Sequence, residues 1–270
     1  MTEDDALAEA YERGLDAERR GDRETAAAAY AEALRLDPED RGGVAVRLAA
    51  MGLAEPPDGA PPAYVALLFD QHAERFDHML VEQLGYHTPM QLRETLDRLG
   101  LGPWPRLLDL GCGTGLLGES LRDRVGHAAG VDLSEGMLEM AEEKEAYDAL
   151  FRGDALAFLA GTEERWDLIA ATDVAPYLGD PGPLLAAVAA RLTPGGLFAF
   201  STETLPEAAF GGRGWTVGPK HRFAHHPGRL RAALAEAGLE TLHAAAAVIR
   251  HDEGDPVRGE LIVARLRAGG

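Results

Sequence analysis

The sequence predicts an α/β fold in which a mostly parallel β-sheet follows a small all-α hairpin. From Arg106 onward, short apolar segments alternate with helical patterns, which is typical of βαβ units built around a parallel sheet. Before that point, apolar residues recur at helical spacing. No convincing helix separates the last two candidate strands, which indicates an antiparallel hairpin that closes the sheet. The candidate strands span 106–109, 127–132, 147–152, 168–172, 196–202, 244–250 and 259–266.

The first predicted unit is a helical hairpin within residues 1–51. Residues 4–18 and 23–36 each place apolar side chains at helical spacing, and Gly21 with Asp22 supplies the turn between them. The hairpin resembles one tetratricopeptide repeat. The resemblance rests on a glycine at the helix crossing, small and aromatic residues along the second helix and a proline after it: Gly14, Ala26, Tyr30, Ala33 and Pro38.

A single repeat of this kind cannot bury its own apolar face. We therefore expect the hairpin to pack on a third helix at 44–51, on the main domain, or on another subunit. Two roles stay open for residues 1–51. One is packing or homodimerisation, and the other is a groove for a protein partner.

A linker separates the hairpin from the main domain. Residues 52–62 combine proline, glycine and acidic residues without periodicity. The main domain then spans 63–270 and opens with an amphipathic helix or pair of helices over 63–84. A further helix is expected to start at Thr88 and stop at Gly100.

Composition limits the classes of partner. The chain has 270 residues with 45 acidic and 26 basic side chains, and its net charge is −19. Such a surface repels phosphate backbones and anionic membranes, so we expect neither a nucleic-acid nor a membrane partner. The single cysteine excludes an intramolecular disulfide framework. The sequence has no 18-residue apolar run, and we expect no signal peptide. We expect a cytoplasmic protein.

The stretch LLDLGCGTGLLGES, residues 107–120, contains a glycine loop that fits two registers. Gly111, Gly113 and Gly115 form G-x-G-x-G, whereas Gly113, Gly115 and Gly118 form the G-x-G-x-x-G of a dinucleotide site. In either register a buried strand ends, the backbone turns sharply towards a ligand, and a helix follows. The loop alone does not identify the ligand.

Three observations favour a ligand without phosphates. Gly111 follows the strand directly, so the dinucleotide register would begin two residues late. Asp154 follows a third strand, where its carboxylate can accept from the amine of adenine while the Ala155 amide faces a ring nitrogen. About a hundred residues precede the loop and little chain follows the sheet, which is unlike a dehydrogenase. Asp132, at the end of the next strand, could accept from ribose hydroxyls in either case. A nicotinamide-dependent oxidoreductase remains the alternative.

The chain resembles a class I S-adenosylmethionine-dependent methyltransferase from about Ala63 to its C-terminus. The resemblance rests on LLDLGCGTG, GVDLSEGML, GDAL, WDLIAATDV and LTPGGLFAFSTE, in this order. More narrowly, it resembles a bacterial group of predicted methyltransferases containing a tetratricopeptide repeat. The resemblance implies a Rossmann-like seven-stranded sheet with an antiparallel last strand. It also implies S-adenosyl-L-methionine as cofactor and a small-molecule acceptor, methylated at oxygen or nitrogen.

The resemblance also implies a set of cofactor-binding residues. Those after the first and fourth strands would contact the methionine half: Gly111, Cys112, Gly113 and Gly115 in the loop, Asp109 as its support, and Thr172 and Asp173 near the amine and the transferring methyl. Those after the second and third strands would contact the adenosine half: Asp132 at the ribose, Leu133 and Met137 beside the adenine, and Asp154 and Ala155 at its edge. Phe69, Phe76 and Tyr86 would belong to a lid.

Positioning supplies most of the rate in methyl transfer, and a general base is needed only if the nucleophile arrives protonated. The candidates are His225, His221 and Tyr177. As alternatives, His226 caps the helix that begins near Pro227, or the histidines bind a metal ion. Because no further ligand stands at a known spacing, we expect no metal. Arg222 and Arg213 could pair with a substrate carboxylate. We expect no chemistry at Cys112, because no cationic residue stands near it in the sequence.

Overall fold

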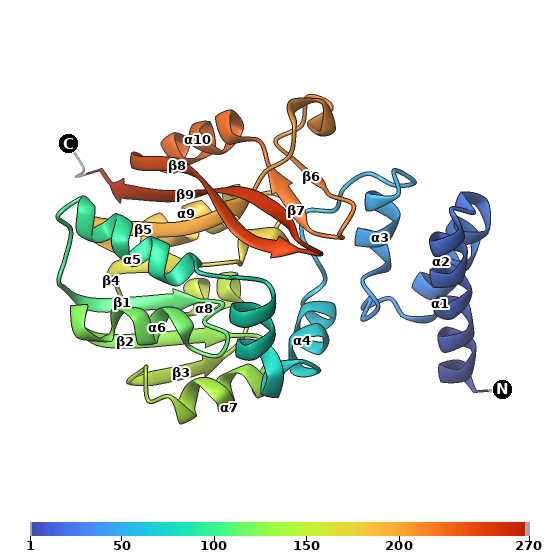
Figure 1. Ribbon diagram of the computed structural model, residues 1–270, viewed down its shortest axis with the longest axis horizontal. Coiled ribbons are helices and arrows are strands. Elements are labelled where there is room, and N and C mark those ends of the chain that lie inside the picture. Colours follow the sequence, from blue (N-terminus) through green and yellow to red (C-terminus); the bar gives the residue numbers. More distant parts are fainter. Residues whose placement is uncertain (1, 268–270) are drawn as a thin grey trace.

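The computed structural model describes residues 2–267, which form an α/β domain with three helices at one side (Figure 1). The seven-stranded sheet has the order β3-β2-β1-β4-β5-β9-β8. Strands β1 to β5 are parallel, whereas β9 is antiparallel to both of its neighbours. The predicted antiparallel hairpin at the end of the chain is therefore confirmed. The strands are β1 Trp104–Leu110, β2 Val125–Asp132, β3 Ala149–Arg152, β4 Trp166–Ala171, β5 Leu192–Glu203, β8 Leu239–Asp252 and β9 Asp255–Leu266.

Helices cover both faces of this sheet, as βαβ connections require. One face buries the leucines of α5 and α6, and the other buries those of α8, α9 and α10. The strand order reverses between β1 and β4, and ligands of open α/β sheets bind at the carboxyl ends of strands at such a point. The helices are α5 Thr88–Arg98, α6 Leu116–Leu121, α7 Glu135–Glu143, α8 Ala155–Gly161, α9 Gly182–Arg191 and α10 Pro227–Glu236.

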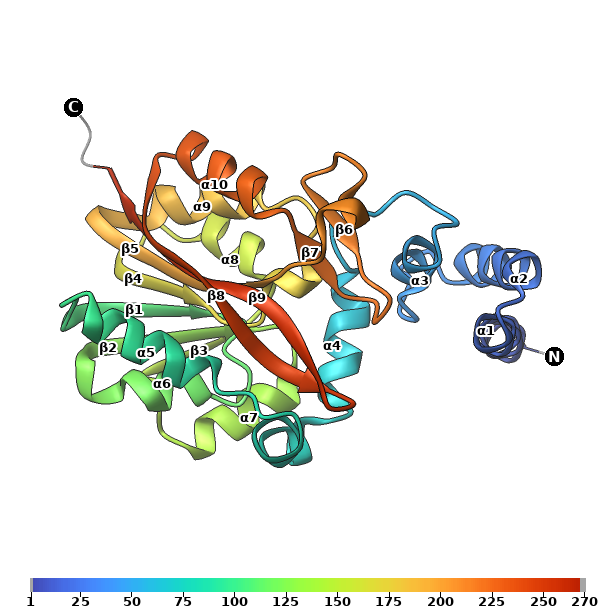
Figure 2. The same ribbon diagram turned by 45° about the horizontal axis from the view of Figure 1, so that its top comes forward.

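The N-terminal helices α1 (Glu3–Arg20) and α2 (Arg23–Leu36) form an antiparallel hairpin (Figure 2). Gly14 lies where the two helices cross, since a Cβ there would stand 2.3 Å from the Tyr30 ring. The hairpin packs on α3 (Val44–Ala50), which is one of the predicted solutions.

Helix α3 also contacts a small sheet that the sequence did not predict. Its Val46 and Ala49 pack against Val217 of β6 (Trp215–Val217) and Phe223 of β7 (Phe223–His225). These two strands pair only with each other. Through α3, the N-terminal hairpin is therefore attached to the α/β domain.

The segment from residue 62 to residue 83 divides into three short helices rather than the predicted one or two. They are α4 (Pro62–Asp70), the 3₁₀ turn η1 (Ala73–Arg75) and the π-helical η2 (His78–Gln83). Asp70 Oδ1 accepts from Ser134 Oγ at 2.5 Å, and Asp77 accepts from Thr114 and Lys144. These bonds tie the segment, which we call the lid, to α7 and the glycine loop. Across the described residues, no helix is long and apolar enough to span a membrane.

Candidate functional site

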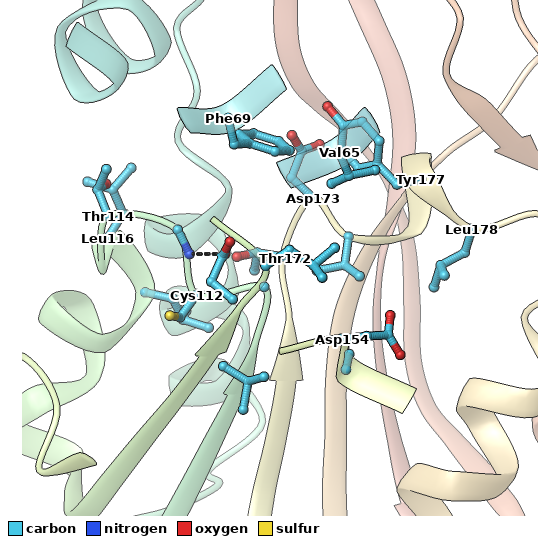
Figure 3. Close-up of a pocket in the computed structure, with 18 of the residues that line it drawn as sticks. Val65, Phe69, Cys112, Thr114, Leu116, Asp154, Thr172, Asp173, Tyr177 and Leu178 are labelled. Carbon is cyan, nitrogen blue, oxygen red and sulfur yellow. Dashed lines mark hydrogen bonds between the residues drawn. The ribbon is translucent and has the colours of Figure 1, made fainter. Parts of the chain in front are cut away.

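A large cavity lies where the strand order predicts a ligand, at the carboxyl ends of β1, β2 and β4 (Figure 3). It encloses about 1080 Å³ of empty space, a volume that includes open solvent at its mouth. The glycine loop and the ends of the strands form one wall. The lid supplies the opposite wall, including Val65, Phe69, Phe76 and Leu80.

The geometry of the glycine loop separates the two registers. Gly111, Gly113 and Gly115 have left-handed φ angles of 64°, 52° and 91°, which other residues adopt only at a cost. A Cβ at Gly113 would meet no atom within 4 Å, so the backbone there is open to the cavity. Gly118 lies inside α6, and a Cβ there would stand 2.4 Å from the Tyr147 ring. Gly118 therefore serves helix packing, and the first register forms the loop.

Asp132 connects the loop to the end of β2. Its Oδ2 accepts from the Gly113 amide at 2.8 Å, and its Oδ1 accepts from the Ser134 amide at 2.9 Å. Burial raises the pKa of Asp132, and the two amides oppose this by stabilising the charged form. Each carboxylate oxygen can accept a second hydrogen bond, so Asp132 retains acceptor capacity for a ligand hydroxyl.

Two buried residues flank the start of the loop, Asp109 near the end of β1 and Cys112 in the loop itself, where it also lines the cavity. The Tyr147 hydroxyl donates to Asp109 Oδ2 at 2.6 Å, while Oδ1 has no partner. Burial raises the pKa of Asp109 to about 7. Burial also raises the pKa of the Cys112 thiol, which keeps it protonated, so the side chain acts here as a small apolar group.

Of the residues predicted to hold adenosine, all but Met137 line the cavity. Asp132, Leu133, Asp154 and Ala155 line the cavity. Asp154 also caps α8, since its Oδ1 accepts from the Ala157 amide at 2.9 Å. Met137 is fully buried in the inner face of α7 and is not part of the cavity wall, because the turn of the helix directs it towards the core.

Of the residues predicted to lie near the methionine half, Thr172 and Asp173 line the cavity, and so do Phe76, Tyr86 and Tyr177. The rings of Phe69 and Tyr177 lie edge to face (Figure 3), with centroids 5.4 Å apart. Phe69 contacts Phe76 in the same way, with centroids 5.7 Å apart. This aromatic contact joins the lid to the end of β4.

A buried cluster of charges lies behind Asp173. Arg222 donates to Asp173 Oδ1 at 2.5 Å, to the Tyr177 hydroxyl at 2.7 Å and to Glu203 Oε1 at 2.7 Å. Arg250 donates to Glu203 Oε1 at 2.8 Å. Two guanidinium groups thus balance two carboxylates. Arg222 is therefore not available for a substrate carboxylate, and Arg213 pairs on the surface with Glu55.

Neither of the candidate histidines, His221 and His225, lines the cavity. His221 Nε2 lies 2.9 Å from Glu18 Oε1 on the N-terminal hairpin, and His225 Nε2 lies 3.1 Å from the Gly179 carbonyl. Burial lowers the pKa of His225 to about 4. His226 caps α10 by accepting from the Gly228 and Arg229 amides, which is the alternative considered for it. The structure therefore does not place His221 or His225 where a base would meet the acceptor.

The strand order, the glycine loop and a carboxylate at the end of β2 together define a class I methyltransferase fold with a site of the S-adenosylmethionine type. A sequence model of the family described as "Methyltransferase domain" matches residues 84–244. The chain belongs to this family, and S-adenosylmethionine is the cofactor of the class. This decides against the oxidoreductase alternative.

Curated relatives match over parts of their length. The biotin biosynthesis bifunctional protein BioCD of Bordetella avium is 33% identical over 144 residues, which are 53% of this chain and 30% of the relative. The ubiquinone biosynthesis O-methyltransferase of Coxiella burnetii is 31% identical over 99 residues, 36% of this chain and 42% of the relative. The chain thus spans less than half of either protein.

Solved structures share the fold. A chain of the complex between the Haloferax volcanii Trm112 methyltransferase activator and a putative methyltransferase aligns with a TM-score of 0.59 and 20% identity, over 76% of this chain and 99% of that chain. Magnesium protoporphyrin IX methyltransferase from Synechocystis with bound SAM aligns with a TM-score of 0.51 and 18% identity, over 73% of this chain and 83% of that chain. At these identities the likeness extends to the fold alone.

Proposed function

We propose that this chain transfers a methyl group from S-adenosylmethionine to oxygen or nitrogen of an uncharged small molecule. The observation that carries the proposal is the cavity itself, where an open glycine backbone faces three carboxylates, those of Asp132, Asp154 and Asp173. The cofactor offers hydroxyls, an aromatic amine and an ammonium group, each a hydrogen-bond donor. Three acceptors at the ends of three strands match these donors.

The residues present fit this cofactor. Asp132 would accept from the ribose hydroxyls, Asp154 from the adenine amine and Asp173 from the ammonium group. Gly113 would allow the close approach that its open backbone offers. The cofactor supplies the activated methyl and the leaving group, and the protein aligns the acceptor for in-line attack.

The remaining wall indicates the class of acceptor. Among the described residues that line the cavity there is no lysine, arginine or histidine, and the lid contributes apolar and aromatic side chains. An anionic acceptor would find no cation to pair with. The Tyr177 hydroxyl oxygen accepts from Arg222, so its own proton is free to donate to an oxygen or nitrogen of the acceptor and orient it.

The N-terminal hairpin fits a single tetratricopeptide-like unit, which the contact of Gly14 with Tyr30 supports. A homodimer contact or a protein partner at this hairpin, and a cytoplasmic location, stay predictions.

Two measurements test the proposed function. Calorimetric titration should give binding of S-adenosylmethionine and S-adenosylhomocysteine and none of NAD. Formation of S-adenosylhomocysteine should then be followed with matched pairs of acceptors, such as a naphthol and the corresponding naphthoate. Binding of NAD without the methyl donor would refute the function, and a preference for the carboxylates would refute the acceptor class.

A further inference from the structure

The N-terminal hairpin touches the α/β domain through a polar cluster centred on Glu18 of α1. Glu18 Oε2 accepts from the Tyr30 hydroxyl and from Arg47 Nη1, the latter at 3.1 Å. Its Oε1 lies 2.9 Å from His221 Nε2. The side chains of Glu18, Arg47 and His221 are each a quarter exposed or less. One carboxylate therefore joins the hairpin, α3 and the turn between β6 and β7.

That turn needs support from outside. Strands β6 and β7 have three residues each and form their own two-stranded sheet, and such a pair is marginal by itself. His221 has a φ of 58°, a left-handed conformation that costs energy for a residue with a Cβ. The contact with Glu18 and the packing of α3 hold this conformation in place.

The residue after His221 is Arg222, which contacts Asp173 and Tyr177 of the cavity wall and also Glu203. The guanidinium is planar and its donors have a fixed geometry, so its position sets the positions of the oxygens that it binds. Asp173 itself has a φ of 62°, another left-handed conformation. A shift of the β6–β7 turn would be transmitted to two side chains of the cavity wall.

We infer that the N-terminal hairpin positions the methionine end of the cofactor site, with Glu18 holding His221 and so placing Arg222, Asp173 and Tyr177. Glu18 and His221 are positioning residues, since neither lines the cavity. The inference rests on the proposed function in one respect, the contact of Asp173 with the cofactor's ammonium group.

The test compares two ligands that differ only at the methionine end of the cofactor. S-adenosylhomocysteine carries the amino acid part, and 5′-methylthioadenosine carries adenosine and sulfur without it. Glu18→Ala removes the carboxylate, and His221→Gly removes the imidazole while keeping the left-handed backbone accessible. Arg222 stays unchanged, because removal of one partner of a buried ion pair strongly destabilises a protein. Glu32→Ala is the control, since Glu32 pairs with Arg13 inside the hairpin.

We expect Glu18→Ala and His221→Gly each to weaken S-adenosylhomocysteine binding about three- to tenfold, with 5′-methylthioadenosine within about twofold of the wild type. The double variant should be no weaker than the single ones, because both break the same contact. Glu32→Ala should leave the affinities for both ligands unchanged.

Unchanged affinities, or equal losses for both ligands, would overturn the inference, because the second result indicates general loosening. Asp173→Asn separates the two proposals, because it keeps a side-chain oxygen that can accept from Arg222 and removes only the negative charge that would attract the ammonium group. If Asp173→Asn weakens S-adenosylhomocysteine binding about tenfold or more, while Glu18→Ala and His221→Gly leave it unchanged, only the role of the hairpin fails. If Asp173→Asn binds both ligands with the affinities of the wild type, the proposed ammonium contact fails and the inference fails with it.

Discussion

Alanine substitutions at Gly113 and Gly118 should have opposite effects, because only one of the two glycines faces the cavity. At Gly113 a Cβ meets no protein atom within 4 Å, so the cost to the fold is that of a left-handed alanine, about 1–2 kcal/mol. The same Cβ would project into the cavity, where the cofactor is expected. We predict that Gly113→Ala weakens S-adenosylhomocysteine binding at least about tenfold, by overpacking of the complex.

At Gly118 the balance is reversed. A Cβ would stand 2.4 Å from the Tyr147 ring, whose hydroxyl donates to Asp109. Overpacking and loss of this hydrogen bond together cost about 2–5 kcal/mol. For a domain of this size we expect a melting temperature lower by about 5–15 °C. At temperatures where Gly118→Ala is folded, it should bind S-adenosylhomocysteine within about threefold of the wild type.

Thermal melting and calorimetric titration of both variants show which of the two glycines faces the bound cofactor. The opposite pattern, with binding abolished by Gly118→Ala and retained by Gly113→Ala, would refute the assignment of the loop. It would restore the dinucleotide register.

Three further predictions concern side chains near the loop. Asp132→Asn should weaken S-adenosylhomocysteine binding about 10- to 100-fold in a calorimetric titration, because its NH₂ would face an amide donor; Asp148→Asn, at the opposite end of the sheet, is the control and should change the affinity less than about twofold. Asp109 has a pKa of about 7 against an ordinary 3.8, so its contribution to stability is fully present below pH 4 and is lost as the pH rises through 7. Between pH 5 and 8, the melting temperature should therefore fall less for Asp109→Asn than for the wild type. Equal falls in the two proteins would contradict the raised pKa of Asp109. Cys112 should react with a thiol reagent only after unfolding, and fast labelling of the native protein at pH 8 would show that its thiol is accessible.

The sequence predicted the elements whose signals are local. The seven strands appear within a few residues of their expected positions, except that β8 begins five residues earlier, at Leu239. Strand β3 begins at Ala149 rather than at residue 147, because Tyr147 turns towards Asp109 and Gly118. Helical periodicity also indicated the N-terminal hairpin. It could not show that the lid breaks into three pieces, since its contacts with α7 and the loop come from distant residues.

The surroundings of the candidate histidines could not be predicted for a related reason. His225 was a candidate because histidine titrates in the pH range that a general base needs. Strands of three residues give no periodic signal, so β6 and β7 were not predicted. Alternation along β7 puts Phe223 and His225 on the same buried side, where His225 faces a second, small chamber beside Phe198. Without that strand the direction of the ring could not be inferred.

The buried charges near Asp173 show why the hairpin and the site are best considered together. Arg222 and Arg250, with Asp173 and Glu203, come from four separate parts of the chain, and no spacing rule would group them. A buried ion pair adds little net stability, because the cost of removing the charges from water offsets their attraction. It does fix geometry, since each bond has a narrow range of distances and angles. The arrangement therefore suits a site whose task is to align two reactants. The same reasoning explains the contact of Glu18 with His221, because a turn that carries such an arginine must itself be held in place.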